Sequence, residues 1–234
     1  LSMLVYNTSY PIQKFNEKFL ESFIPKLSLR YSPNDTKNIK KNLKYLNKSN
    51  IFSLNRIGES ESIEAGGSMT LGFDYEKENE DSKKILGFGA ATVFKDKKND
   101  NLSSTSTLNQ KQSDIVGDIY YSPLDNLNIN YNFSLDHNLD NSNLHDLNLE
   151  LQTNNFVTTF EFYEENNQIG DKSYLGSEIK YLLDEENSLS FSTRKNKKND
   201  LTEFYNLIYE YKNDCLTASF EYNKQFYVGN DIKP

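Results

Sequence analysis

Few side chains in this sequence have the type and spacing that metal or nucleophilic chemistry requires. The two histidines, His137 and His145, flank the acidic and amide-rich stretch "DHNLDNSNLHD" (136–146), which offers oxygen and nitrogen atoms to a metal ion. The stretch lacks the glycine and final glutamate of an EF-hand calcium loop, and two histidines without a partnering cysteine are too few for a usual zinc site. No G-x-S-x-G motif is present to support a Ser–His–Asp hydrolase. We therefore expect no metal site, no cofactor and no enzymatic activity.

Two other features invite a chemical interpretation. The glycines of "GFGAAT" (87–92) are spaced superficially like those of a nucleotide-binding loop, but the segment alternates and no helix follows it. We expect a strand there, with Gly87 and Gly89 on its polar face. Cys215 is the single cysteine and permits no disulfide within the chain.

Composition narrows the class of protein. The formal net charge of -8 argues against a nucleic-acid binder, because a phosphate backbone favours a basic surface. Hydrophobic residues make up 36% of the chain and aromatic residues 13%, which is polar for a thick buried core yet too aromatic for a disordered chain. The longest apolar runs are too short for a transmembrane helix, and "LSMLVYNTSYPI" (1–12) lacks the features of a signal peptide.

The elements that must position any site are strands, because apolar residues recur at every second position. In "LNINYNFSLDH" (127–137) the odd positions up to Leu135 are apolar, and the even positions up to Asp136 are polar. A period of two predicts strands with two unlike faces. The same alternation occurs in about eleven segments: 23–31, 68–76, 85–94, 115–121, 127–135, 147–151, 156–162, 175–183, 189–191, 205–211 and 216–222.

The connections between these segments alternate in length, which is typical of an up-and-down antiparallel meander with its tight turns at one end. The short connections are 77–84, 122–126, 153–155, 184–187 and 212–214. The mostly longer, polar ones are 32–67, 95–113, 137–143, 164–172 and 195–200. The single candidate for a helix, 37–48, falls within a long connection.

Strands with one apolar and one polar face suit either a soluble β-sandwich or a membrane barrel. Three features favour the barrel. The strands approach the length that a tilted strand needs to cross a bilayer. No charged residue occurs among the residues assigned to the apolar faces, where a basic side chain at mid-membrane would cost about 2–4 kcal/mol. Aromatic residues gather near strand ends, as interfacial girdles require.

Three stretches resemble a known family. "NIFSLNRIGESESIEAGGSMTLGFDYE" (50–76), "SDIVGDIYYSPLDNLNINYNFSLDHNL" (113–139) and "YEYKNDCLTASFEYNKQFYVGNDIKP" (209–234) are similar, in order and spacing, to segments of the lipopolysaccharide-assembly outer-membrane protein family LptD, also called OstA or Imp. The resemblance extends over roughly residues 21–234.

The resemblance implies an all-β fold, a portion of an up-and-down antiparallel transmembrane β-barrel with about 11–12 strands of a larger barrel. The whole chain, 1–234, would belong to the barrel domain, without the periplasmic jelly-roll domain and the terminal strand. In that family lipopolysaccharide (LPS) arrives over a periplasmic Lpt bridge. Its acyl chains enter the outer leaflet through a seam between the first and last strands, while the sugar passes through the lumen.

The implied partners are therefore LPS, an LptE-like plug lipoprotein in the lumen, the Lpt bridge through the absent N-terminal domain, and outer-membrane lipid. The implied location is the Gram-negative outer membrane, and no covalent chemistry is involved. Cys215 matches a position where many relatives have one or two cysteines bonded to the periplasmic domain. It follows the short connection 212–214 and would face the oxidising periplasm, where such a bond persists. The alternative is a free thiol that merely packs.

Two further groups are candidates for contacts with the substrate. Polar residues in the middle of strands would line the lumen and touch substrate or plug: Asn130, Asn132, Asn148, Glu150, Glu178 and Arg194. Lysines in long connections, Lys195, Lys197 and Lys198 in particular, would contact phosphates of departing LPS. The simpler interpretation of such charge runs is a solvated loop.

Two alternatives to a segment of an LPS translocon remain. A general porin or autotransporter-type barrel of about twelve strands would close on itself by pairing its first and last strands. A soluble extracellular adhesion protein would bury its apolar faces in a two-layer core.

Overall fold

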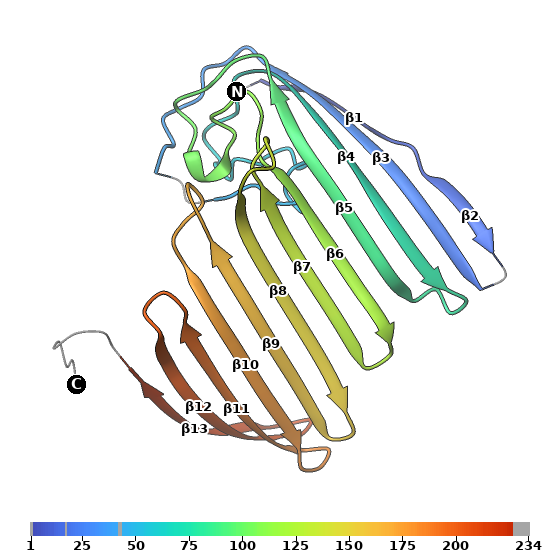
Figure 1. The fold of residues 1–234 in the computed structure, drawn as a ribbon, viewed down its shortest axis with the longest axis vertical. Helices are drawn as coiled ribbons and strands as arrows, with labels where there is room; N and C mark the ends of the chain where they lie inside the picture. Colours follow the sequence, from blue (N-terminus) through green and yellow to red (C-terminus); the bar gives the residue numbers. More distant parts are fainter. Residues whose placement is uncertain (1, 17, 42–43, 227–234) are drawn as a thin grey trace. The chain divides into compact units, whose positions relative to one another are not determined.

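A computed structural model of the protein describes residues 2–16, 18–41 and 44–226. Apart from one short 3-10 turn, η1 (Ser104–Ser106), its regular elements are strands of a single thirteen-stranded antiparallel sheet (Figure 1). The strands are β1 (Leu4–Ser9), β2 (Ile12–Asn16), β3 (Phe19–Ser32), β4 (Gly66–Asn79), β5 (Lys84–Lys95), β6 (Ile115–Leu124), β7 (Leu127–Leu135), β8 (Ser142–Thr153), β9 (Phe156–Glu165), β10 (Ser173–Leu182), β11 (Asn187–Asn196), β12 (Leu201–Lys212) and β13 (Thr217–Gln225). The described part of the chain holds no helix long and apolar enough to cross a membrane.

From β3 to β13 each strand pairs with the next one in the sequence, so the predicted meander is confirmed. All eleven predicted segments are strands, and short and long connections alternate as expected. Among the described residues, β1 and β13 pair with one neighbour each. The helix considered for 37–48 is absent from its described residues; residues 42 and 43 lie outside them.

The alternation did not reveal the strands at the start of the chain. β1 pairs with the second half of β3 and β2 with its first half, so the two form one edge strand interrupted at Tyr10 and Pro11. The Tyr10 N–H still donates to the Pro25 carbonyl, at 3.2 Å. Phe15, opposite Leu20, lies on the polar face, so the alternation of apolar and polar residues is interrupted in β2.

On β3 and β4 the two faces of the sheet are buried in the reverse order to a soluble protein. On β3 and β4, Leu29 and Met69 are opposite each other and are 44% and 36% exposed, respectively. One residue away on the other face, Ser28 and Thr70 pair and are 0% exposed. A strand face that meets lipid carries large apolar side chains in exposed rows, and the small polar side chains lie on the other face. The structure is therefore a single sheet with an exposed apolar face rather than a two-layer sandwich.

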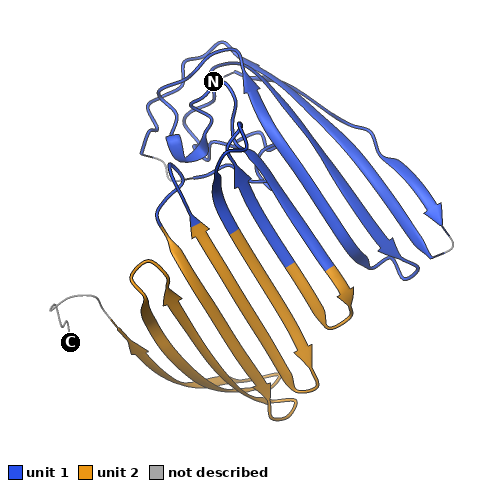
Figure 2. Ribbon diagram, in the orientation of Figure 1, with its two compact units in different colours: residues 1–121, 130–145, 165–171 blue, residues 122–129, 146–164, 172–234 orange. Residues whose placement is uncertain are grey.

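The chain is divided into two compact units (Figure 2). Unit 1 comprises residues 1–121, 130–145 and 165–171, and unit 2 comprises residues 122–129, 146–164 and 172–234. In unit 1 the described residues of the long connections 33–65 and 96–114, together called the loop layer below, pack on the polar face of the sheet. Their apolar side chains form a small core with β5 and β6: Leu46, Ile51, Ile57, Leu102 and Leu108 from the loops, and Ala91, Val93 and Val116 from the strands.

Close packing on the apolar face explains why residue 117 is a glycine. A Cβ added at Gly117 of β6 would lie 2.3 Å from Cζ of Phe133 and 2.6 Å from the Gly89 carbonyl oxygen. Gly117 is opposite Ala90 of β5, on the same face as Phe88 and Ile119. Phe133 of β7 therefore lies on the apolar face, as its place in the alternation predicts.

Candidate functional site

A buried charged cluster attaches the loop layer to the polar face of the sheet. The Arg56 guanidinium donates to both carboxylate oxygens of Glu64, at 2.7 and 2.9 Å, and the Lys95 ammonium of β5 lies 3.1 Å from the same carboxylate. Arg56 also donates to the hydroxyls of Thr70 and Ser68 on β4, at 2.8 and 2.9 Å. Such bidentate, charge-assisted bonds are the strong ones in proteins, so this cluster fixes the position of the loop.

The cluster keeps Glu64 ionised. Burial alone would raise the pKa of the Glu64 carboxyl, but the charge and hydrogen bonds of Arg56 and Lys95 lower it to about 2. A buried carboxylate remains charged only where cations surround it in this way.

A second attachment lies further along the polar face. The carboxylate of Asp74 on β4 forms ion pairs with Lys26 of β3 and with Lys48 of the loop layer. Gly89 of β5 leaves room for this cluster, because a Cβ there would come within 2.5 Å of Asp74 Oδ1 and 2.8 Å of Lys48 Cε. Gly87 and Gly89 therefore lie in a strand and are buried on its polar face, as predicted.

Polar side chains join the two halves of the loop layer to each other. The Thr36 hydroxyl accepts hydrogen bonds from the Ala65 N–H and the Asn99 amide, both at 2.8 Å. The Asn101 amide donates to the Thr36 carbonyl at 3.0 Å, and the Ile39 N–H donates to the Asn101 carbonyl at 2.8 Å. The loop layer is therefore one folded body rather than two independent loops.

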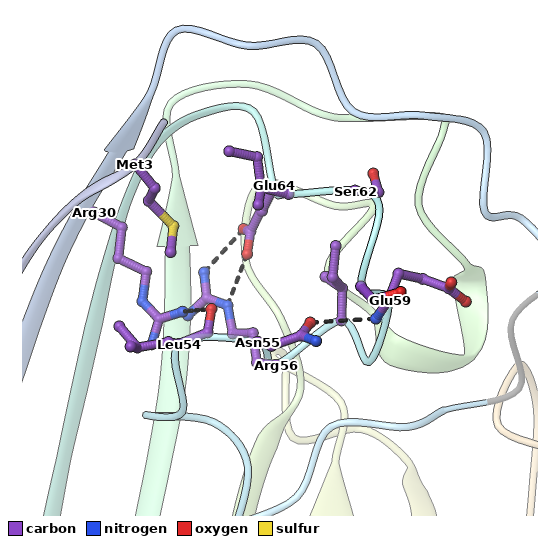
Figure 3. A pocket seen from close by; sticks show the side chains of 11 residues that line it. Met3, Arg30, Leu54, Asn55, Arg56, Glu59, Ser62 and Glu64 are labelled. Carbon is purple, nitrogen blue, oxygen red and sulfur yellow. Dashed lines mark hydrogen bonds and ion pairs between the residues drawn. The ribbon is translucent and has the colours of Figure 1, made fainter. Parts of the chain in front are cut away.

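A cavity of about 220 Å³ opens beside the buried charged cluster (Figure 3). Two guanidinium groups, those of Arg30 on β3 and Arg56, lie at its wall together with the carboxylates of Glu59 and Glu64. Its remaining walls are mixed apolar and polar: Met3, Leu54, Asn55, Ile57, Ser60, Ser62 and Ile63.

A hydrogen-bond network at the start of β6 surrounds Asp114. Its carboxylate accepts from the Ser134 hydroxyl at 2.8 Å and from the Asn143 amide at 2.7 Å. The Asn167 amide donates to Asn143 Oδ1 at 2.6 Å and connects the 166–172 loop to the network. Burial raises the pKa of the Asp114 carboxyl even though these two donors act to lower it.

The six residues predicted to line the lumen fall into two groups. Asn130, Asn132, Asn148 and Glu150 are spread along β7 and β8, and the two β7 residues are exposed on the face opposite Phe133. In unit 2, Glu178 and Arg194 line one pocket of about 160 Å³ on the polar face of β9–β12. Contact of these residues with substrate or plug stays a prediction.

Arg194 is held in place by its surroundings. It forms an ion pair with Glu203, and its guanidinium carbon lies 5.1 Å from the Tyr174 ring centroid and 5.4 Å from that of Phe204. Both distances are typical of cation–π contacts.

The three lysines predicted to contact phosphate lie at the loop end of β11. The Lys195 ammonium is 2.5 Å from Asp200, and the Lys197 ammonium is 3.8 Å from Glu164 and 4.6 Å from the Phe162 ring centroid. The Lys198 N–H donates to Asn196 Oδ1 at 3.0 Å. Two of the three side chains thus have carboxylate partners, and a bound phosphate would compete with those partners.

Cys215 is exposed in the turn 213–216 between β12 and β13, at the tight-turn end of the strands, as expected. Its N–H donates to Asn213 Oδ1 at 3.0 Å, which fixes the turn. A disulfide between Cys215 and another domain remains a prediction.

The structure also changes the interpretation of one histidine. β8 begins at Ser142, so His145, near the end of the stretch 136–146, lies within a strand. Its Nδ1 is 2.7 Å from the Tyr131 hydroxyl, and the two rings are stacked.

The buried charged cluster and the neighbouring Arg30 were missed by the sequence reasoning. Arg56 and Glu64 fall within the quoted stretch 50–76, but a loop has no periodicity that assigns its side chains to a face. The rarity of arginine was the one signal in the sequence that could have drawn attention to these residues. The chain has three arginines, and in the structure two of them line the same cavity.

Comparison with known proteins supplies the family. Residues 4–183 match the family described as LptD, LPS transport system D. Two of the three stretches noted in the sequence lie inside this range, and the third, which contains Cys215, lies beyond it. No curated protein matches the chain.

Proposed function

Because the match covers more than half of its length, the chain belongs to the LptD family of LPS transport proteins, and we propose that it forms part of the barrel wall that inserts LPS into the outer leaflet of the Gram-negative outer membrane. In this proposal the exposed apolar face contacts membrane lipid and the polar face borders the aqueous lumen. The acyl chains of LPS remain near the apolar face while its sugars pass the polar face.

The exposure of the apolar face is the observation that carries this proposal. Phe191 and Leu207 are opposite each other in the middle of β11 and β12, and both are exposed. Charged side chains on the apolar face lie near strand ends, such as Lys77, whose ammonium is 3.8 Å from Glu21 and 4.0 Å from the Phe19 ring centroid. Lysines near the interface extend their charge to water, whereas at mid-membrane a charge is costly.

The edge strands of the sheet would have to pair with further strands in a larger barrel. Unpaired backbone groups in hydrocarbon cost several kcal/mol each, so an edge strand within the bilayer needs a partner. We expect β1, β2 and β13 to pair with further strands of the complete barrel. A porin made of this sheet alone would instead need β1 to pair with β13.

The expected partners follow from this assignment. We expect an LptE-like lipoprotein in the lumen and the periplasmic Lpt bridge at the tight-turn end. The loop layer already occupies part of the polar face in unit 1, so a plug would have to bind beside it.

The test is depletion of the complete protein in cells, followed by measurement of LPS at the cell surface. We expect surface LPS to fall and newly made LPS to accumulate before the outer membrane, with other outer-membrane proteins initially unaffected. Unchanged surface LPS together with reduced uptake of small solutes would favour a general porin.

A further inference from the structure

The side chain of Arg30 is buried without the partners that a buried guanidinium needs. It is 5% exposed and reaches the wall of the 220 Å³ cavity from the polar face of β3 (Figure 3). Its Nε donates to Ser28 Oγ at 3.3 Å and its Nη1 to the Leu54 carbonyl at 3.5 Å, both long contacts. Nη2 has no hydrogen-bond partner. A buried donor left unsatisfied is costly, which points to a missing acceptor.

The buried carboxylate of the cavity wall is already bound by other cations. Glu64 accepts both bonds of the Arg56 fork and lies 3.1 Å from the Lys95 ammonium. Three buried cations, Arg30, Arg56 and Lys95, therefore share one buried carboxylate, which leaves two positive charges uncompensated. Glu59 also lines the cavity, but it is half-buried and is the carboxylate with which an incoming anion would compete.

We propose that this cavity binds a phosphate monoester group, with Arg30 as its principal donor. A guanidinium binds phosphate through two parallel hydrogen bonds, and a doubly charged phosphate would balance the two uncompensated charges. Met3, Leu54 and Ile63 give the cavity an apolar rim suited to the uncharged part of a phosphorylated molecule. The phosphate is that of a lipid headgroup or free phosphate from the medium. The site does not depend on the transport function proposed above.

The experiment is a calorimetric titration of the complete protein in detergent with three probes. These are inorganic phosphate, an acylated glucosamine disaccharide bearing phosphates, and the same lipid after enzymatic removal of its phosphates. We expect a phosphate-bearing probe to bind and Arg30→Gln to weaken it at least tenfold. Glu59→Gln should tighten binding several-fold, because it removes the competing carboxylate. Lys77→Gln, which removes one positive charge far from the cavity, should leave affinity unchanged.

The source of the phosphate follows from the order of affinities. Much tighter binding of the phosphorylated lipid than of both other probes identifies a headgroup, and equal binding of that lipid and inorganic phosphate identifies the free ion. Binding of no phosphate-bearing probe overturns the proposal, and so does equal affinity of wild type and Arg30→Gln. Should Arg30→Gln fail to fold, as judged by heat-modifiable migration in gels, Glu59→Gln decides: unaltered affinity there contradicts the site.

Discussion

The carboxylate of Glu64 in the loop layer and the ammonium of Lys95 in β5 lie 3.1 Å apart, and both side chains are almost fully buried. The same carboxylate receives the Arg56 guanidinium, so one acidic residue of the loop layer forms ion pairs with two buried cations. We expect Glu64→Gln to lower the free energy of unfolding by about 3–5 kcal/mol, because it leaves both cations buried without a counter-ion.

Urea unfolding of the protein in detergent measures this effect, and limited proteolysis of residues 33–65 shows where it acts. Glu61→Gln is the matched control: Glu61 pairs with Lys37 at 3.1 Å on the exposed surface. Exposed pairs contribute about 0–1 kcal/mol, so this variant should resemble wild type. Equal stability of the two variants would show that the cluster does not anchor the loop.

The pKa of Glu64 predicts how the attachment depends on pH. Its ordinary value is 4.5, and in the folded protein it is lowered to about 2. A lowered folded pKa means that the stabilisation is complete above about pH 4.5 and is lost as the pH falls towards 2. The free energy of unfolding, measured with urea in detergent at several pH values, should therefore fall over this window. In Glu64→Gln the fall should be smaller, and a wild-type value without any change between pH 5 and 2 would contradict the assignment.

Gly117 provides a test of packing on the apolar face. Gly117→Ala places a Cβ 2.3 Å from Phe133 and 2.6 Å from a backbone oxygen, which a side-chain rotation alone cannot relieve. We expect a loss of about 1–3 kcal/mol, the usual cost of overpacking. Gly67→Ala is the control, because its nearest neighbour would be 3.7 Å away. Thermal unfolding followed by circular dichroism compares the two; similar midpoints would mean that Phe133 does not cover Gly117.

Neighbouring residues of β11 test which face meets lipid. Phe191 pairs with Leu207 on the apolar face, and Ser192 pairs with Asn206 on the polar face. Phe191→Arg should reduce the yield of folded barrel in lipid vesicles, since arginine at mid-membrane costs about 2–4 kcal/mol. Ser192→Arg introduces arginine at the adjacent position, on the polar face, and should fold nearly as well as wild type. A lower yield of Ser192→Arg than of Phe191→Arg would show that the polar face, and not the apolar face, meets lipid.

Cys215 tests the proposed disulfide to a periplasmic domain. Its exposed position at the tight-turn end leaves the thiol accessible to a partner cysteine. Non-reducing electrophoresis of the complete protein should show one faster-migrating oxidised form that Cys215→Ser loses. Identical migration of the two proteins, with and without reductant, would support a free thiol.

The sequence by itself determined the strands, their two faces and the position of Cys215. These features are local: a period of two assigns each side chain of a segment such as 127–135 to one face, whatever the segment pairs with. The weak alternation of residues 4–16, with a break at Pro11 and Phe15 on the polar face, hid the edge strand from the same reasoning.

Only the tertiary structure decided which polar side chains meet. Arg30, Arg56, Glu64 and Lys95 come from two strands and a loop, and their contacts depend on the register of β3, β4 and β5 and on the path of the loop layer. A loop without periodicity does not specify its path locally; long-range ion pairs and a small apolar core fix it. The charged cavity is therefore visible in the folded chain and not in its pattern of residues.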